Sequence, residues 1–258
     1  MCLLLLAFDV AADRPWLLLG NRDEFHARPT APAHAWIDAA GIIGGRDLQA
    51  GGTWLALNRN GRFAAVTNVR TGQPPNGARS RGELVAQFLA GAQTPLDYAA
   101  VVAASRAQFG PFNLIVGDRE SAAGASSTRE QAWRFGRGVH VLSNGPPGAA
   151  WPKVRRLDAA FSTMLQRGGF GSPGAAWPDE ADLLDLLGDT SGAADAELPQ
   201  TGVGLELERR LAPMFIRGDA YGTRASTLAY ARANGSCVLV ERGFGPDGVP
   251  IGEVRIET

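Results

Sequence analysis

Cys2 directly follows the initiator methionine, where a cysteine can do chemistry without a second side chain. Removal of Met1, which is usual before a small side chain, leaves a thiol and a free α-amine on one residue. An α-amine with a pKa of about 7.7–8.0 can serve as the base for its own nucleophile. The position therefore favours an N-terminal nucleophile that attacks acyl groups. The alternative is that Cys2 is a small apolar residue at the start of a buried strand.

Polar residues end several of the apolar runs, and together they could surround this thiol. They are Asn21, Arg22, Asp23, Glu24, Arg46, Asp47, Asn68, Arg70, Asn144, Asp219, Arg224 and Ser226. Each one alone is typical of a turn. As a set they predict one rim, in which an asparagine amide can donate to an oxyanion and a charged group can position the α-amine.

Other chemical signatures are missing from the sequence. It contains no GxSxG, GxxxxGK[ST] or HExxH motif. Residues 243–248 match the letters of GxGxxG, but their Pro-Asp-Gly sequence is typical of a turn and no helix is expected after them. Cys2 and Cys237 lie far apart, and the three histidines share no metal-ligand spacing. We therefore expect no disulfide and no metal site.

Composition limits the classes of partner. The chain has 258 residues and a formal net charge of -1, without a basic stripe, so we do not expect it to bind nucleic acid. The apolar run 2–8 is short and has no positive segment before it, which argues against a signal peptide. No run reaches the roughly 18 apolar residues of a membrane span. We expect a cytoplasmic protein that takes a small-molecule substrate or ligand; the sequence leaves the oligomeric state open.

Two apolar runs at the start of the chain, 3–10 and 16–19, are separated by a turn and predict a β-hairpin buried on both faces. The second strand ends at Asn21–Glu24. Because the strands of a hairpin are adjacent, we expect these polar residues to return close to Cys2.

Helix runs and strand runs alternate along the remaining chain. Residues 28–35 read as an irregular loop, and Asn58–Gly61 as a hairpin turn. A capping box of Ser80 and Glu83 opens one helix, to about Leu89, and Thr94 opens a second. Further helices are expected at 151–167 and 178–187. Further strands are expected at 112–116, 132–135, 139–142, 214–216, 226–231, 236–242 and 251–256. Hairpin connections favour antiparallel sheets, so we predict a single α+β domain over residues 1–258, with two antiparallel sheets between helical layers.

Several ordered motifs resemble the NRDE family, that of the transport and Golgi organisation protein 2 homologues. Behind Met1-Cys2 they are Asn21–Glu24, Gly44–Asp47, Gly51–Leu55, Thr67–Arg70, Ser80–Gly82, Leu142–Gly145 and Tyr221–Arg224. The resemblance covers nearly the whole chain. It implies a four-layer αββα sandwich like that of the N-terminal-nucleophile hydrolases.

Within that fold, the pattern is similar to the choloylglycine and penicillin V acylases. The similarity implies that Cys2 attacks a C–N amide or a related acyl bond while Asn68 and Asn144 stabilise the oxyanion. The implied catalytic set is Cys2, Arg22, Asp23, Asn68, Asn144 and Arg224. The expected substrate-binding set is Asn21, Glu24, Arg46, Asp47, Trp54 and Arg70. No cofactor is expected for this reaction.

One departure from the acylases concerns Arg22 and Asp23. The corresponding residues of those enzymes are not adjacent, whereas neighbours on an extended strand point to opposite sides. Either Glu24 replaces Asp23 as the orienting carboxylate or the backbone bends. The alternative function is a non-catalytic haem or acyl-lipid binding or trafficking protein on the same fold. Eukaryotic members of the family are associated with haem movement, lipid and acyl-CoA metabolism, and Golgi organisation.

Overall fold

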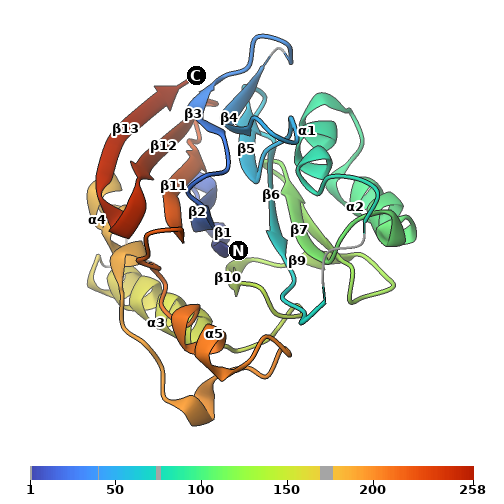
Figure 1. The fold of residues 1–258 in the computed structure, drawn as a ribbon. Helices are drawn as coiled ribbons and strands as arrows, with labels where there is room; N and C mark the ends of the chain where they lie inside the picture. The colour runs from blue at the N-terminus through green and yellow to red at the C-terminus, as the bar shows by residue number, and fades with distance from the viewer. Residues whose placement is uncertain (1, 40, 74–76, 169–176) are drawn as a thin grey trace.

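Two antiparallel β-sheets face each other at the centre of the computed structural model, and helices cover their outer faces (Figure 1). The structure describes residues 2–39, 41–73, 77–168 and 177–258. This αββα arrangement confirms the predicted α+β sandwich.

The elements follow a simple order within each layer. The first sheet has the order β10 (Gly138–Leu142), β1 (Cys2–Ala11), β2 (Arg14–Phe25), β11 (Tyr221–Ala231), β12 (Cys237–Phe244), β13 (Pro250–Glu257). The second has the order β3 (Thr30–Ala35), β4 (Ile42–Asp47), β5 (Leu55–Asn58), β6 (Phe63–Asn68), β7 (Phe112–Gly117), β8 (Ala122–Ser126), β9 (Trp133–Phe135). Helices α3 (Pro152–Arg167) and α4 (Glu180–Asp185) cover the first sheet, and α1 (Gly82–Ala90) and α2 (Pro95–Ala104) the second. The short α5 (Leu205–Arg210) follows α4. No helix within the described ranges is long and apolar enough to cross a membrane.

Strand β1 is buried on both faces, which explains its continuous apolar sequence. Cys2 shares the face between the sheets with Leu4 and Leu6, whereas Leu3 and Leu5 pack toward α3 and α4. Because side chains alternate along a strand, the first residue of β1 directs its thiol into the space between the two sheets.

Strands β1 and β2 form the predicted hairpin. Cys2 lies directly opposite Arg22 in the register, and Leu3 lies opposite Asn21. On its other side β2 pairs with β11, whose register shifts between Thr223 and Ala225. The hairpin therefore returns the polar end of β2 to Cys2, as predicted, and an irregularity in β11 lies beside it.

Both predicted helix starts after residue 79 are present. The Ser80 backbone N–H donates to Glu83 Oε1 at 3.0 Å, which is one half of a capping box, whereas the Ser80 hydroxyl accepts from the Gly82 N–H at 3.3 Å and helical geometry begins at Gly82. The Thr94 hydroxyl accepts a hydrogen bond from the Asp97 backbone N–H at 3.3 Å. These contacts fix the starts of the two helices that cover the second sheet.

Two element predictions are wrong. Residues 30–35 form β3, where Pro32 is tolerated because the strand lies at a sheet edge. The expected strand at 214–216 is an irregular segment whose apolar residues are nonetheless buried; the Phe215 N–H, for example, donates to the Asp189 carbonyl at 2.9 Å. Burial alone does not require a strand, so an apolar run of three residues does not distinguish a strand from a buried irregular segment. The segment between α4 and α5 is mostly irregular and contains a short 3-10 helix, Asp195–Glu197.

Candidate active site

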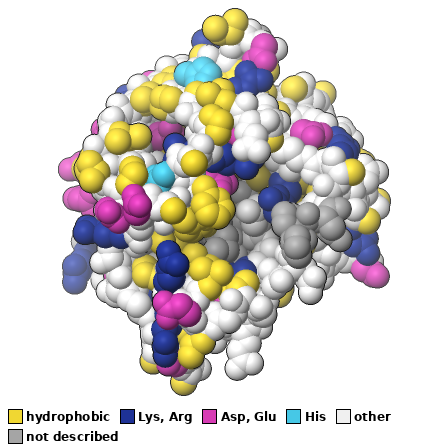
Figure 2. Space-filling model, in the orientation of Figure 1, with side chains coloured by type: hydrophobic (Ala, Val, Ile, Leu, Met, Phe, Trp, Pro, Cys, Tyr) yellow, Lys and Arg dark blue, Asp and Glu magenta, His cyan; other side chains and the backbone are white. Residues whose placement is uncertain are grey.

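A cavity of ≈ 600 Å³ lies between the sheets where β1 begins and β2 and β6 end. Figure 2 shows the hollowed face, with basic and hydrophobic side chains along the opening. The predicted site residues that line this cavity are Cys2, Arg22, Asp23, Glu24, Arg46, Asp47, Trp54, Asn68 and Arg224. The fold thus brings together most of a set that is scattered over more than 220 positions of the sequence.

Cys2 is held firmly at the start of β1 and is 6 % exposed. Its carbonyl oxygen accepts a hydrogen bond from the Ser143 hydroxyl at 3.0 Å. Burial raises the pKa of the thiol and the Asp23 charge raises it further, while Arg22 and a hydrogen bond from the Asp23 backbone lower it. A thiol with a raised pKa is protonated at neutral pH, so it needs a base before it can attack. None of the described residues that line the cavity is a histidine.

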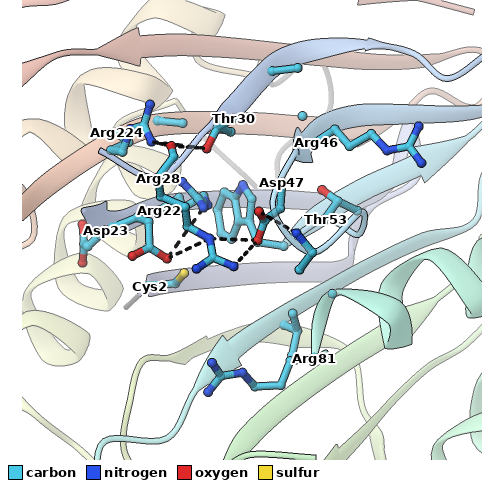
Figure 3. Close-up of a pocket in the computed structure, with 18 of the residues that line it drawn as sticks. Cys2, Arg22, Asp23, Arg28, Thr30, Arg46, Asp47, Thr53, Arg81 and Arg224 are labelled. Carbon is cyan, nitrogen blue, oxygen red and sulfur yellow. Dashed lines mark hydrogen bonds and ion pairs between the residues drawn. The ribbon is translucent and has the colours of Figure 1, made fainter. Parts of the chain in front are cut away.

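Arg22 and Asp23 point to opposite faces of β2, as expected of neighbours on a strand (Figure 3). Arg22 lies on the face of Cys2, with its Nη2 3.7 Å from Glu24 Oε2. Asp23 is 1 % exposed, and its Oδ1 accepts a hydrogen bond of 2.7 Å from the Thr223 hydroxyl. Both residues still line the cavity, because it lies at the strand end. Asp23 is the carboxylate with the largest effect on the pKa of Cys2, whereas Glu24 pairs with Arg22.

Lys153 is a residue that the motif search missed. It is the only lysine of the sequence, it follows Pro152 in the first turn of α3, and it is 2 % exposed. Its Nζ has no hydrogen-bond partner among the described residues. Burial lowers the pKa of Lys153 to about 8, and the charge of Asp23 opposes that shift more than any other group does. The one signal in the sequence was compositional: a lone lysine in a chain that otherwise uses arginine.

Asn68 and Asn144 come together from the ends of β6 and β10. The Asn144 side-chain amide donates to the Asn68 carbonyl at 2.8 Å, and the Asn144 carbonyl accepts from the Arg70 N–H at 2.7 Å. Asn144 is fully buried, whereas the half-buried Asn68 lines the cavity. The two asparagines therefore differ in kind: Asn68 faces the space beside Cys2, and Asn144 holds the backbone that carries it.

Arg224 sits at the irregularity of β11 and lines the cavity. Its Nη1 donates to the Arg28 carbonyl, to the Phe25 carbonyl at 3.3 Å and to the Thr30 hydroxyl at 3.2 Å (Figure 3). These acceptors belong to the connection between β2 and β3, so Arg224 ties that connection to β11.

The remaining predicted lining residues form the rim and the wall of the cavity. Arg46 pairs with Asp38 at 2.6 Å, and Asp47 pairs with Arg28 at 2.7 Å. Trp54 is packed in the core between the sheets. The charges at this rim are largely neutralised within the protein.

Asn21 and Arg70, expected to bind substrate, do not line the cavity. The Asn21 amide donates to the Leu187 and Met214 carbonyls at 3.0 and 2.8 Å, and its oxygen accepts from Ser226 at 2.6 Å. Arg70 forms a buried ion pair with Glu208 of α5. Both residues therefore hold structural elements together. Sequence motifs alone could not distinguish this structural role from a place in the cavity lining.

The fold is similar to that of the conjugated bile acid hydrolase from Clostridium perfringens. Two mutant forms of that protein match with TM-scores of 0.54 and 0.53, each at 9 % sequence identity. The matches cover 100 % and 99 % of this chain and 92 % of the hydrolase. At this identity the likeness concerns the fold alone.

Sequence relatives extend over almost the same length. The bovine Transport and Golgi organization protein 2 homolog is 31 % identical over 95 % of this chain and 93 % of its own length. The human homolog is 30 % identical with the same coverage, and the Drosophila melanogaster protein is 28 % identical over 90 % of this chain. The sequence profile of the family described as Transport and Golgi organisation 2 matches residues 1–246. The chain therefore belongs to the Transport and Golgi organisation 2 family.

Proposed function

We propose that the protein is an N-terminal-nucleophile cysteine amidohydrolase that cleaves a C–N amide or related acyl bond of a small molecule. The observation that carries this proposal is the position of Cys2, the first residue of β1, whose side chain lines a cavity of ≈ 600 Å³ beside Arg22, Asp23 and Asn68. The fold likeness to the conjugated bile acid hydrolase supports the same class of reaction.

The α-amine of Cys2, free once Met1 is removed, supplies the missing base. It takes the thiol proton while the sulfur attacks the substrate carbonyl carbon, and the oxygen becomes an oxyanion. The Asn68 amide donates a hydrogen bond to that oxygen. Collapse of this tetrahedral intermediate breaks the C–N bond, and the protonated α-amine of Cys2 gives its proton to the leaving nitrogen. A thioester on Cys2 remains. Water then attacks the thioester with the amine as base, the C–S bond breaks, and the acid is released.

Asp23 and Lys153 act behind the nucleophile in this mechanism. The Asp23 carboxylate orients the α-amine, and the backbone of Asp23 already hydrogen-bonds the thiol. Burial raises the pKa of Asp23, while Lys153, the largest favourable charge near it, lowers that pKa. Lys153 is therefore a positioning residue, which keeps Asp23 ionised inside the protein.

The haem-binding alternative makes different demands on the cavity. Haem iron is held by His, Cys, Met or Tyr side chains, and Cys2 is the only residue of these types in the described lining. That lining also carries more charged side chains than large apolar ones. These residues do not fit haem, and we assign it no step.

The test is a panel of acyl amides and thioesters assayed with the wild type, Cys2→Ala and Cys237→Ala. Cys237 begins β12 and lies outside the cavity, so it controls for the loss of a thiol. We expect turnover in the wild type and in Cys237→Ala but not in Cys2→Ala, together with an intact mass that lacks Met1. A retained methionine on active protein would overturn the self-base mechanism. Tight haem binding that survives Cys2→Ala would favour the alternative.

A further inference from the structure

The cavity wall also carries an arginine, Arg81, that forms no ion pair with any carboxylate in the described part of the chain. We propose that Arg81 binds an anionic group of the substrate, so that the substrate is an acyl compound carrying a carboxylate, sulfonate or phosphate close to its scissile bond. This inference rests on the proposed function, because it assigns the substrate class of the same cavity.

Three other arginines of the cavity lining are already paired with carboxylates. Arg28 is 2.7 Å from Asp47, Arg79 is 3.0 Å from Glu83, and Arg46 is 2.6 Å from Asp38. The Arg81 guanidinium, in contrast, makes one weak hydrogen bond among the described residues, from its Nη1 to the Pro111 carbonyl at 3.3 Å. Within the described ranges no carboxylate lies within ion-pair distance of it. Its remaining N–H groups are available to a ligand.

Arg81 is directed into the cavity by its backbone. It immediately precedes α1, and its side chain reaches into the space below Cys2 (Figure 3). The helix start is fixed by close packing, because a Cβ on Gly52 would lie 2.5 Å from the carbonyl carbon of Gly82. The Thr53 N–H also donates to the Gly82 carbonyl at 3.4 Å. A long, flexible side chain thus starts from a fixed point on the wall.

Arg81 is half-buried, and it forms no ion pair with a carboxylate among the described residues, although Cys2 and Glu24 oppose the effect of its burial from a distance. Burial lowers the pKa of Arg81, and Cys2 is the group that most opposes this shift. A desolvated, unpaired guanidinium is costly, and an anionic ligand would remove that cost. A solvated surface arginine would not show this combination.

A second guanidinium reinforces the anion site. Arg22 is 8 % exposed, lines the same cavity, and its Nη1 has no hydrogen-bond partner among the described residues. Its Nη2 lies 3.7 Å from Glu24 Oε2, so Nη1 is the donor that remains for a ligand. Arg224 is less available, because its Nη1 donates to the Phe25 and Arg28 carbonyls and its Nε is buried. Arg81 and Arg22 thus offer planar N–H donors in the cavity that Cys2 lines, and such donors suit carboxylate and phosphate oxygens.

The test uses matched probes that differ only in charge. N-hexanoylglycine is compared with neutral N-hexanoylglycinamide, and N-hexanoyltaurine and N-hexanoylphosphoethanolamine extend the series to sulfonate and phosphate. Each is assayed with the wild type, Arg81→Met, Arg81→Lys and the control Arg59→Met, an exposed arginine outside the cavity. We expect wild-type kcat/KM to favour a charged probe over the neutral one by about 10- to 100-fold. Arg81→Met should abolish this preference, Arg81→Lys should keep part of it, and Arg59→Met should leave it unchanged.

Binding to Cys2→Ala separates failure of this inference from failure of the proposed function. If calorimetry shows that the charged probes bind Cys2→Ala and lose affinity in Cys2→Ala/Arg81→Met, the anion site stands even when no probe is hydrolysed. If Cys2-dependent hydrolysis favours N-hexanoylglycinamide, or the preference for charge survives Arg81→Met, the anion site is overturned while the hydrolase stands. The member of the series that is preferred identifies the anion.

Discussion

Asp23 and Lys153 lie near each other behind Cys2, in residues that are 1 % and 2 % exposed, and each is the group that most opposes the pKa shift that burial imposes on the other. Neither charge could be kept at this depth alone, because burial of an unpaired ion is expensive. The two residues connect β2 to the first turn of α3. Asp23 directly follows Arg22, the residue that lies opposite Cys2 in the β1–β2 hairpin.

Replacement of Lys153 should change how stability depends on pH. The pKa of Lys153 is about 8 in the folded protein and 10.5 without the fold, so between these values the unfolded chain binds more protons. The free energy of unfolding therefore rises with pH across this window, by up to about 3 kcal/mol from this group. Urea unfolding at pH 7.5 and 9.5 should show the rise in the wild type and a smaller one in Lys153→Met. An equal rise in both would contradict a lowered pKa.

The reactivity of Cys2 should respond to its two charged neighbours in opposite directions. Because burial raises the pKa of Cys2, its alkylation by iodoacetamide should still accelerate above pH 9. Arg22→Gln should move the midpoint of the rate–pH curve upward, and Asp23→Asn should move it downward. The Cys237→Ala background removes the other thiol. Shifts of the same sign in both variants would show that the charges do not act as described.

The two asparagines should separate into a kinetic and a structural residue. Asn68→Ala removes the amide that faces the cavity, so kcat should fall by about 10²–10³-fold with little change in stability. Asn144→Ala leaves the Asn68 carbonyl without its donor and should cost about 1–3 kcal/mol of unfolding free energy. Thermal unfolding and steady-state kinetics on both variants check the division, which equal stability losses would refute.

The Arg70–Glu208 pair should behave as a buried ion pair rather than as part of the binding site. Arg70→Met leaves the Glu208 carboxylate, which is 3 % exposed, without its counter-charge and with hydrogen bonds from Thr201, and should destabilise the protein by about 3–5 kcal/mol. The double variant Arg70→Met/Glu208→Leu should recover much of that loss in chemical denaturation. If the single variant instead keeps its stability and only raises KM, Arg70 contacts the substrate.

The sequence was informative where contacts are local or where strand order follows from turns. The β1–β2 hairpin follows from two apolar runs and the turn between them, and it places Arg22 opposite Cys2. Arg81 lies within a recognised motif, but the sequence Ser80–Glu83 predicts only the start of a helix. The sequence does not show which side chains lack an ion-pair partner in the folded protein. Lys153 and Arg70 depend on packing between segments far apart in the chain, so their surroundings follow only from the assembled layers.

The two-sided burial of β1 has a consequence for its alignment with its neighbours. In a strand with one polar face, a slip by one residue exposes apolar groups and is strongly opposed. Both faces of β1 are apolar, so hydrophobicity distinguishes the two alignments only weakly. Specific contacts must set it instead, among them the hydrogen bond from the Ser143 hydroxyl to the Cys2 carbonyl and the one from the Trp16 indole N–H to the Gly61 carbonyl at 3.1 Å. Inserting one leucine between Leu3 and Leu6 would leave a foldable apolar strand whose thiol points toward α3.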